Sequence, residues 1–174
     1  MPLDSSDFRL VVDWPSPGVR FRDIGPVLLD PELLAEASSS LVRAAEAVAD
    51  GVDLVVAPES RGFLFGPAIA TALGAGFIPA RKPDKLPPET HSVSYELEYG
   101  EDHLHVAHGD LTGRRVLIHD DLLATGGTAA ALARLVELTG GVPVAALFLG
   151  EIPALGGRGA LGGLPVSSVV AFED

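Results

Sequence analysis

The sequence predicts an α/β protein with a central, mostly parallel sheet flanked by helices. Short apolar runs rich in valine, isoleucine and leucine alternate with longer segments at helical spacing, which is typical of a parallel sheet covered on both faces. The chain has 174 residues, enough for one sizeable core but short for two. We therefore expect residues 1–174 to form a single domain.

The first half of the chain contains one long helix. It is expected over residues 32–49, because Asp30 is a suitable N-cap, Pro31 suits the first helical position and Gly51 follows the end. The next expected elements are a strand at 52–57, a helix at 62–73 interrupted by Pro67, and a strand at 77–80.

An exposed loop and an antiparallel pair are expected in the middle of the chain. The stretch "RKPDKLPPETHS", residues 81–92, is rich in proline and charge and has no apolar face, which indicates an exposed loop and a candidate lid. The stretch "VSYELEYGEDHLHVAHG" alternates apolar and polar residues around Gly100, which indicates a two-stranded antiparallel excursion.

The second half returns to alternating strands and helices. Strands are expected at 116–119, 142–149 and 166–171, with a helix at 128–138. The stretch "LGGRGALGG", residues 155–163, is expected to be a loose and flexible connection, because glycine places few restraints on the backbone.

The composition argues against several classes of protein. A formal net charge of −12 disfavours a nucleic-acid partner that is bound through a basic face. No apolar run approaches the length of a membrane span and the N-terminal residues lack a basic start, so we expect a cytoplasmic protein without a membrane partner. The absence of cysteine removes disulfides, thiolate zinc sites and a cysteine nucleophile.

The stretch "VLIHDDLLATGGTAAAL", residues 116–132, predicts a phosphate site. Gly126 and Gly127 let backbone N–H groups approach a ligand, and Thr125 and Thr128 add hydroxyl donors at the start of a helix whose dipole favours an anion. No lysine follows the glycines as it does in a Walker A loop. A monophosphate fits this cradle.

Two neighbouring acids precede the cradle, where the strand is expected to end. The carboxylates of Asp120 and Asp121 can accept hydrogen bonds from two adjacent hydroxyls, or can hold the waters of a metal ion. Together with the cradle they indicate a site for a ribose 5-phosphate. The plainer interpretation is a solvated strand end followed by an ordinary turn.

The motif "VLIHDDLLATGGT" resembles the 5-phospho-α-D-ribose 1-diphosphate (PRPP) signature of the type I phosphoribosyltransferases. The segments "WPSPGVRFRDIGPVL", "PESRGFLFGP", "RKPDKLP" and "YELEYG" resemble, in the same order, other characteristic segments of the adenine phosphoribosyltransferase family. The similarity runs from about Trp14 to Leu149. Five ordered motifs are far more specific than one.

The resemblance implies a fold, a reaction and partners. The fold is that of the type I phosphoribosyltransferases, with a small hood contributed by about residues 1–30 and a flexible antiparallel loop arm over about residues 81–105. The implied reaction is a purine-salvage displacement at the anomeric carbon, in which adenine and PRPP give AMP and diphosphate with Mg²⁺ as cofactor. A homodimer is also implied, in which a partner's residue matching Arg81 approaches the site.

The resemblance also assigns roles to the sugar-phosphate residues. Asp120 and Asp121 would hold the ribose hydroxyls, with a possible water-mediated contact to Mg²⁺, which is held mainly by the diphosphate. The residues that would bind PRPP or AMP besides these two are Ser60, Arg61, Arg81, Lys82, Lys85, Ala124, Thr125, Gly126, Gly127 and Thr128. The peptide bond between Glu59 and Ser60 is expected to be cis.

The catalytic and base-binding residues follow from the same resemblance. Glu98 would handle the purine proton, whereas strand alternation alone leaves Glu96 and Glu98 equally placed. Arg61 and Lys85 would neutralise charge on the departing diphosphate. The base-binding residues would be Arg20, Phe21 and Arg22. Phe21 is expected either to stack on adenine or to pack in the core.

Four positions depart from the family pattern. Gly25 stands where Ser or Thr is usual, and Arg20 where an apolar residue is frequent. Asp84 replaces a usual glycine and adds negative charge to the basic loop, which weakens its attraction for a diphosphate. His119 stands in a normally apolar strand and is expected to be a structural histidine rather than a proton shuttle.

Two other functions stay open. One is another type I phosphoribosyltransferase that acts on a 6-oxopurine or a pyrimidine, because the PRPP signature does not identify the base. The other is a non-catalytic regulator that binds PRPP or a nucleotide. The segments "YELEYG" and "GVRFRDI" favour adenine.

Overall fold

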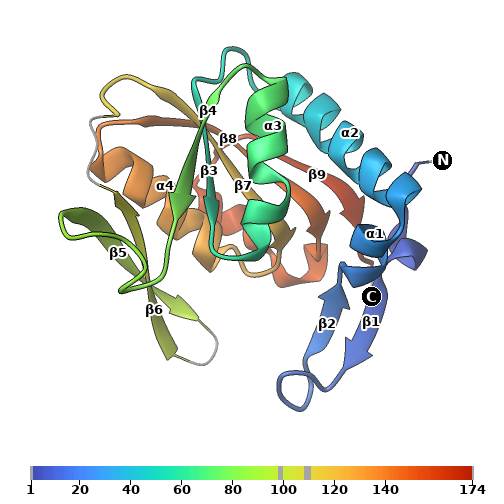
Figure 1. The fold of residues 1–174 in the computed structure, drawn as a ribbon. Coiled ribbons are helices and arrows are strands. Elements are labelled where there is room, and N and C mark those ends of the chain that lie inside the picture. The colour runs from blue at the N-terminus through green and yellow to red at the C-terminus, as the bar shows by residue number, and fades with distance from the viewer. Residues whose placement is uncertain (1, 98–99, 108–110, 174) are drawn as a thin grey trace.

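The computed structural model describes residues 2–97, 100–107 and 111–173, and its centre is a five-stranded parallel sheet (Figure 1). The strands lie in the order β4-β3-β7-β8-β9. Their bounds are Leu54–Pro58 for β3, Gly76–Ala80 for β4, Arg115–Leu123 for β7, Val142–Glu151 for β8 and Val166–Ala171 for β9. The predicted α/β class and its parallel sheet are confirmed.

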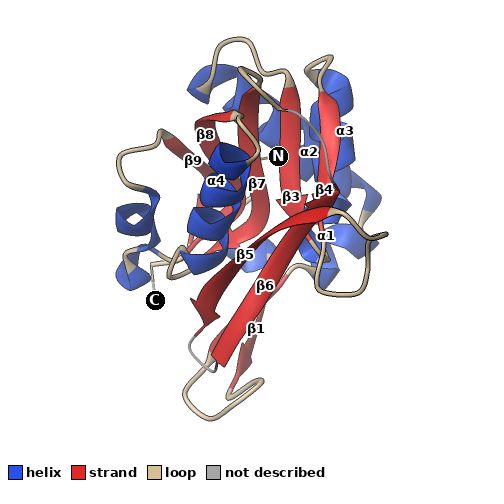
Figure 2. Cartoon of the chain, turned by 90° about the vertical axis from the view of Figure 1, so that its left-hand side faces the viewer, coloured by secondary structure: helices blue, strands red, loops and turns tan. Residues whose placement is uncertain are grey.

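Helices cover both faces of this sheet (Figures 1 and 2). On one face lie α2, Pro31–Val48, and α3, Gly66–Ala72, and on the other lies α4, Gly127–Leu138. Each face has its own buried apolar cluster, and both draw on β7, whose successive side chains point to opposite faces. The sheet is therefore buried on both sides, as expected for parallel strands.

Local signals explain the boundaries of the helices. The side chain of Asp30 accepts hydrogen bonds from the backbone of Glu32 and Leu33, and so caps α2 as predicted. The predicted helix at 62–73 is instead a 3-10 turn, Arg61–Leu64, followed by α3. Pro67 lies in the first turn of α3, where its missing N–H costs nothing, so it begins a helix rather than interrupting one.

The N-terminal residues form a hairpin that projects from the sheet (Figure 1). Strands β1, Arg9–Val12, and β2, Arg20–Asp23, pair antiparallel and lead into the short helix α1, Gly25–Leu29. These strands are too short to have given a clear pattern in the sequence. The side chain of Phe8, just before β1, is buried in the core and fixes the base of the hairpin.

A second antiparallel pair forms an arm, as predicted around Gly100 (Figure 2). Its strands are β5, Thr90–Leu97, and β6, Gly100–Ala107. The predicted exposed loop is shorter than residues 81–92, because its last residues, from Thr90 on, already pair with β6. At the root of the arm the backbones of Arg81 and His105 exchange hydrogen bonds at 2.7 and 2.8 Å.

The glycine-rich segment after β8 is ordered into two 3-10 turns, Pro153–Leu155 and Gly157–Leu161, so the predicted loose connection is wrong. Gly157 and Leu161 are buried in it. Close packing of glycine backbones against neighbouring chain, which composition does not reveal, fixes the segment.

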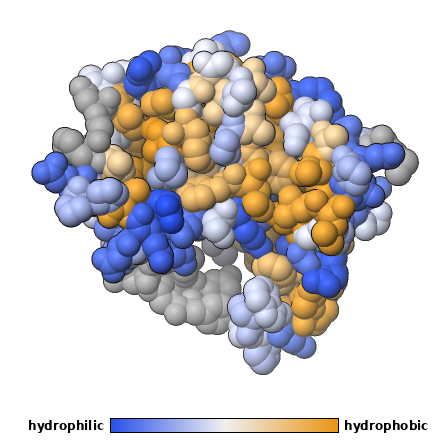
Figure 3. All heavy atoms as spheres, viewed as in Figure 1, coloured by the Kyte–Doolittle hydropathy of each residue, from blue (hydrophilic) through white to orange (hydrophobic). Residues whose placement is uncertain are grey.

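The surface combines acidic and apolar regions. Apolar side chains gather near α1 on the face seen in Figure 3, and Leu29 at the end of α1 is 87% exposed. Among residues 2–97, 100–107 and 111–173, no helix combines the length and the apolar character of a membrane span.

Candidate active site

The two neighbouring acids lie inside a paired strand and not at its end. We expected the strand to stop at His119, but β7 continues to Leu123 because Leu122 and Leu123 pair with Gly150 and Glu151 of β8. This non-local pairing is the reason that the predicted boundary is wrong. The polar turn after β7 still lies at the carboxyl edge of the sheet, where ligands bind in open α/β folds.

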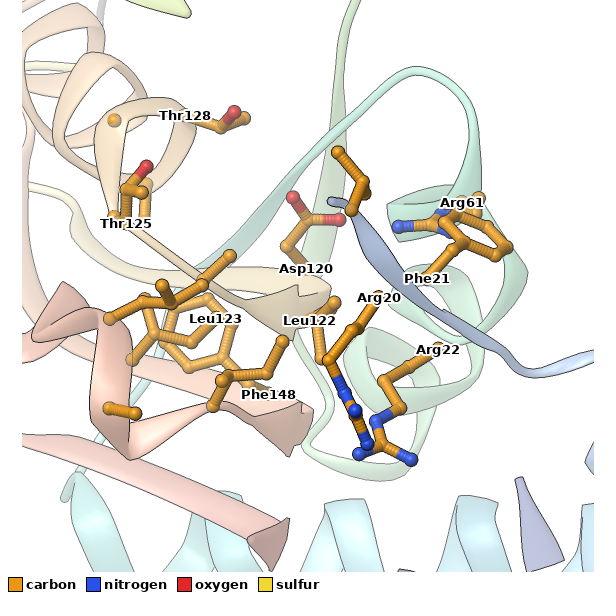
Figure 4. Close-up of a pocket in the computed structure, with 18 of the residues that line it drawn as sticks. Arg20, Phe21, Arg22, Arg61, Asp120, Leu122, Leu123, Thr125, Thr128 and Phe148 are labelled. Atoms are coloured by element: carbon orange, nitrogen blue, oxygen red, sulfur yellow. The ribbon is translucent and has the colours of Figure 1, made fainter. Parts of the chain in front are cut away.

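A cavity of about 730 Å³ opens at this edge, between the β1–β2 hairpin and the start of α4 (Figure 4). The predicted site residues in its wall are Arg20, Phe21, Arg22, Arg61, Asp120, Ala124, Thr125, Gly126, Gly127 and Thr128. The structure thus brings together in one cavity the predicted phosphate cradle, the first acid, the diphosphate arginine and the base segment.

The cradle is formed by the turn from β7 into α4. Gly126 is the N-cap of α4 and has φ +84°, a left-handed conformation that glycine adopts without strain. The first N–H groups of α4 have no partner within the helix, and the hydroxyls of Thr125 and Thr128 lie on the same side of the cavity (Figure 4). This arrangement can bind a phosphate.

Asp120 faces the middle of the cavity, between the threonines and Arg61 (Figure 4). Its Oδ1 accepts a hydrogen bond of 2.9 Å from the backbone N–H of Asp121. Burial raises the pKa of Asp120 well above its ordinary value, and the neighbouring Asp121 carboxylate raises it further. A carboxylate at this position is suited to accept hydrogen bonds from a sugar hydroxyl.

Asp121 lies behind the cavity and supports Arg61. Its side chain is 3% exposed, and its Oδ2 forms an ion pair of 2.9 Å with Nε of Arg61. Burial raises the pKa of the Asp121 carboxyl, and Arg61 opposes that shift. Of the two acids only Asp120 lines the cavity, so a contact between Asp121 and a ribose hydroxyl stays a prediction.

Arg61 and Phe21 meet at the far side of the cavity. The guanidinium carbon of Arg61 lies 5.0 Å from the ring centroid of Phe21, within the range of a cation–π contact. Phe21 also packs edge-on against Trp14 with 4.4 Å between centroids. Phe21 is therefore a wall of the cavity, held in place by two neighbours, while stacking on a base stays a prediction.

The flanking arginines of the hood differ in burial. Arg20 is exposed, whereas Arg22 is buried with its guanidinium carbon 4.7 Å from the ring centroid of Phe172. Both line the cavity. Gly25, one of the departures from the family pattern, begins α1, and its N–H donates a 2.8 Å hydrogen bond to Asp23 Oδ1.

The turn before Arg61 contains the predicted cis peptide between Glu59 and Ser60. The Glu59 carboxylate accepts hydrogen bonds from Nε of Arg81 at 2.9 Å and from the backbone N–H of Lys82 at 3.1 Å. It thus ties the turn to the start of the basic loop.

The residues predicted to bind diphosphate apart from Arg61 lie outside the cavity wall, so their roles stay predictions; they are Ser60, Arg81, Lys82 and Lys85. Asp84 in the same loop has φ +62°, the conformation for which the usual family glycine is suited. Glu98, predicted to handle the purine proton, lies outside the described residues, as does Tyr99.

His119 is a structural residue, as expected. It is fully buried in β7, and its Nδ1 lies 3.0 Å from the carbonyl oxygen of Leu147 on β8, to which it donates a hydrogen bond. Burial lowers the pKa of His119 to about 4. The imidazole is therefore neutral at neutral pH.

Sequence reasoning missed the apolar part of the cavity wall. This part consists of Val19, Leu122, Leu123, Phe148, Ile152 and Leu155, with a few smaller neighbours. The signal for Leu122 and Leu123 was their position inside the cradle motif. No local pattern marked the others, because tertiary packing alone brings the segment after β8 to the hood.

The chain offers no dedicated metal cage within the described ranges, since no group of three or more His, Asp or Glu side chains is placed to hold an ion. The half-buried carboxylate of Asp120, an oxygen donor of the kind that Mg²⁺ prefers, faces the cavity. This single carboxylate fits an ion that is held mainly by a diphosphate and contacts Asp120 through water.

The fold and the cradle define a class of protein. A parallel sheet with a left-handed glycine turn opening onto a carboxylate and an arginine is suited to bind a phosphorylated sugar. Consistent with this, the family model described as "Phosphoribosyl transferase domain" matches residues 29–148.

Similar proteins narrow the class further. Adenine phosphoribosyltransferase of Thermoanaerobacter sp. (strain X514) is 49% identical over 166 residues, which are 94% of each chain. The crystal structure of adenine phosphoribosyltransferase from Thermoanaerobacter pseudethanolicus has a TM-score of 0.90 at 47% identity and covers 96% of both chains. The Saccharomyces cerevisiae enzyme, solved with adenine and an imino-altritol bisphosphate, has a TM-score of 0.86 at 38% identity over 94% of each chain. The present chain belongs to the adenine phosphoribosyltransferase family.

The cradle can be tested with Gly126→Ala. A methyl group at this left-handed position would meet the carbonyl oxygen of Gly157 and lie 2.9 Å from Cβ of Ala160, so the turn must distort. We expect affinity for ribose 5-phosphate, measured by calorimetry, to fall about tenfold or more. Gly159→Ala is the matched control, because a Cβ there meets nothing within 4 Å. Equal affinity in the two variants would contradict the assignment of the cradle.

The buried histidine predicts a pH-dependent stability. His119 has a folded pKa of about 4 against 6.5 as its ordinary value, so the unfolded chain binds the proton more tightly. The neutral His119 therefore adds to the free energy of unfolding above pH 6.5, and this stabilisation is lost as the pH falls toward 4. Between pH 7 and pH 5 this loss amounts to about 2 kcal/mol. In urea unfolding, the free energy of unfolding of His119→Leu should fall less between pH 7 and pH 5 than that of the unaltered protein. An equal fall in both proteins would refute the burial of a neutral imidazole.

Proposed function

We propose that this chain transfers the 5-phosphoribosyl group of PRPP to N9 of adenine and releases AMP and diphosphate. The single observation that carries the proposal is the cavity in which the phosphate cradle, the Asp120 carboxylate and the Arg61–Phe21 contact lie together. Relatives that span 94% of this chain at 49% identity carry the name adenine phosphoribosyltransferase, which supports the same reaction. AMP formation from adenine is a purine-salvage step.

The sugar phosphate binds along the carboxyl edge of β7. The N–H groups at the start of α4, with the hydroxyls of Thr125 and Thr128, hold the 5-phosphate, and the backbone between Ala124 and Gly127 shapes the cradle. Asp120 accepts a hydrogen bond from a ribose hydroxyl. These contacts are much the same before and during the reaction, so they chiefly lower the KM for PRPP.

Arg61 stabilises the departing diphosphate. Its guanidinium is fixed by the buried Asp121 on one side and lies over Phe21 on the other. A planar cation held in advance can neutralise charge as the bond to the anomeric carbon breaks, without reorganisation at that moment. This side of the site is completed when the loop closes, by Ser60, Lys82 and Lys85 of the same chain and by Arg81 of a partner subunit. Lys85 then approaches the diphosphate.

The base lies beneath the hood hairpin. Phe21 stacks on adenine, the backbone at Arg20 reads the edge of the base, and Arg22 lies beside it. Since the guanidinium of Arg61 already lies over the ring of Phe21, the base and Arg61 both contact this ring. Closure of the arm excludes water, which would otherwise attack an oxocarbenium-like centre.

Mg²⁺, carried on the diphosphate, would be met by Asp120 through water and would neutralise charge on the leaving group. We also propose a single domain, with residues 1–30 as the hood and residues 81–105 as the mobile arm. A homodimer is proposed as well, and the exposed apolar surface near α1 supports it. The cytoplasmic location stays a prediction.

The reaction is tested by diphosphate release from PRPP and Mg²⁺ with different bases. We expect adenine to be converted to AMP, with hypoxanthine, guanine, xanthine and orotate at least about a hundredfold slower, because a site that pairs with the edge of one base leaves polar groups unpaired against another. Faster turnover of a 6-oxopurine or orotate would assign another phosphoribosyltransferase activity. Calorimetric binding of PRPP with no diphosphate release would favour a regulator.

Glu98 is tested against Glu96, which strand alternation in the sequence predicts to share its face. If Glu98 handles the purine proton, Glu98→Ala should lower kcat by about a hundredfold or more and leave the KM for PRPP nearly unchanged. Glu96→Ala is the matched control and should keep full turnover. An active Glu98→Ala enzyme would remove Glu98 from the mechanism. Loss of turnover in Glu96→Ala alone would assign the handling of the purine proton to Glu96.

A further inference from the structure

The phosphate cradle is supported from behind by the glycine-rich segment after β8. A Cβ on Gly126 would clash with the carbonyl oxygen of Gly157, and a Cβ on Gly157 would clash with the carbonyl oxygen of Ala124. The two backbones therefore touch directly, with no side chain between them. Any shift of Gly157 must be transmitted to the cradle, because close-packed atoms cannot absorb it.

One arginine in this segment is fixed by several hydrogen bonds. Nε and Nη2 of Arg158 donate to the two carboxylate oxygens of Glu151 at 2.8 and 2.6 Å, and Nη1 donates to the carbonyl oxygen of Val166 at 3.0 Å. The hydroxyl of Ser168 donates to Glu151 Oε2 at 2.8 Å. Arg158 immediately follows Gly157, so this network holds the residue that touches the cradle.

The network is anchored to the strand that leads into the cradle. Glu151 is the last residue of β8 and pairs with Leu123 of β7, and the next residue, Ile152, donates its N–H to the Leu123 carbonyl at 2.9 Å. Ala124, the first residue of the cradle, follows Leu123 directly. The carboxylate that binds Arg158 is thus one strand away from the residue that opens the cradle.

Burial makes this ion pair stronger than an ordinary surface pair. The side chain of Glu151 is 7% exposed, and its hydrogen bonds from Arg158 hold its pKa below the usual range. A bidentate pair with satisfied oxygens has a fixed geometry, and removing one partner leaves a buried charge uncompensated. Arg158 is half-exposed and lies outside the cavity wall, so it touches no substrate there.

We propose that Arg158 and Glu151 are positioning residues for the phosphate cradle. Their bidentate pair holds Gly157 against the backbone from Ala124 to Gly126 and so sets the position of the N–H groups that receive the 5-phosphate. The expected effect on the KM for PRPP rests on the proposed function. The expected effect on ribose 5-phosphate binding concerns the cradle alone.

The test is Arg158→Met, which keeps the aliphatic stem and removes the guanidinium. We expect the Kd for ribose 5-phosphate, measured by calorimetry, and the KM for PRPP to rise about tenfold. The kcat and the KM for adenine at saturating PRPP should change less than about twofold, because the base contacts lie elsewhere. Arg158→Lys keeps a cation but not the bidentate fork and should give an intermediate loss.

The matched control is Arg43→Met, which removes a surface ion pair of 2.8 Å with Glu36 on α2. It should leave both ribose 5-phosphate binding and kinetics unchanged, since exposed pairs contribute little. The double variant Arg158→Met with Glu151→Gln removes the uncompensated charge. We expect it to regain thermal stability but not phosphate affinity.

Three results would overturn the proposal. They are unchanged ribose 5-phosphate affinity in folded Arg158→Met and Arg158→Lys proteins, an equal loss in Arg43→Met, and recovery of affinity together with stability in the double variant. If the unaltered protein makes no AMP while Arg158→Met still loses ribose 5-phosphate affinity, the proposed reaction fails and the positioning role stands.

Discussion

The close approach of backbone to backbone at Gly126 is the constraint from which the site follows. The chain must turn from β7 into α4 within three residues, and it does so through a left-handed glycine that packs directly on Gly157. This turn directs the free N–H groups of α4 toward the cavity. A side chain at either glycine would separate the two segments, so this turn depends on glycine for contact as much as for conformation.

Charge in this acidic protein is arranged so that an anion can still bind. The net charge of −12 repels phosphates at a distance, while the cradle uses backbone dipoles and Arg61 provides a local cation. Asp121 balances Arg61 from a buried position, so that only Asp120 presents a carboxylate to the cavity. The two neighbouring acids therefore differ in role: Asp120 faces the cavity and Asp121 fixes the guanidinium of Arg61.

Local chemistry could be predicted from the sequence, and distant contacts could not. The cap at Asp30 and the antiparallel arm around Gly100 each have a signal within a few residues, and both are confirmed. The cis peptide after Glu59, which the family resemblance implied, is confirmed as well. The end of β7 was misplaced because pairing with β8 extends it. The segment around Arg158 was misjudged because its glycines suggest looseness, whereas the pairing with Glu151 and the packing on Gly126 arise only in the folded chain.

Two supports thus converge on one receptacle. The sheet brings Asp120 and Arg61 to its carboxyl edge, and the glycine-rich segment holds the turn that we propose as the phosphate site. A crystal structure of the protein soaked with AMP tests this account most directly. The account predicts the phosphate within hydrogen-bond distance of the backbone N–H groups of Gly126, Gly127 and Thr128, with a ribose hydroxyl on Asp120. A phosphate bound elsewhere, or a ribose with no contact to Asp120, would contradict it.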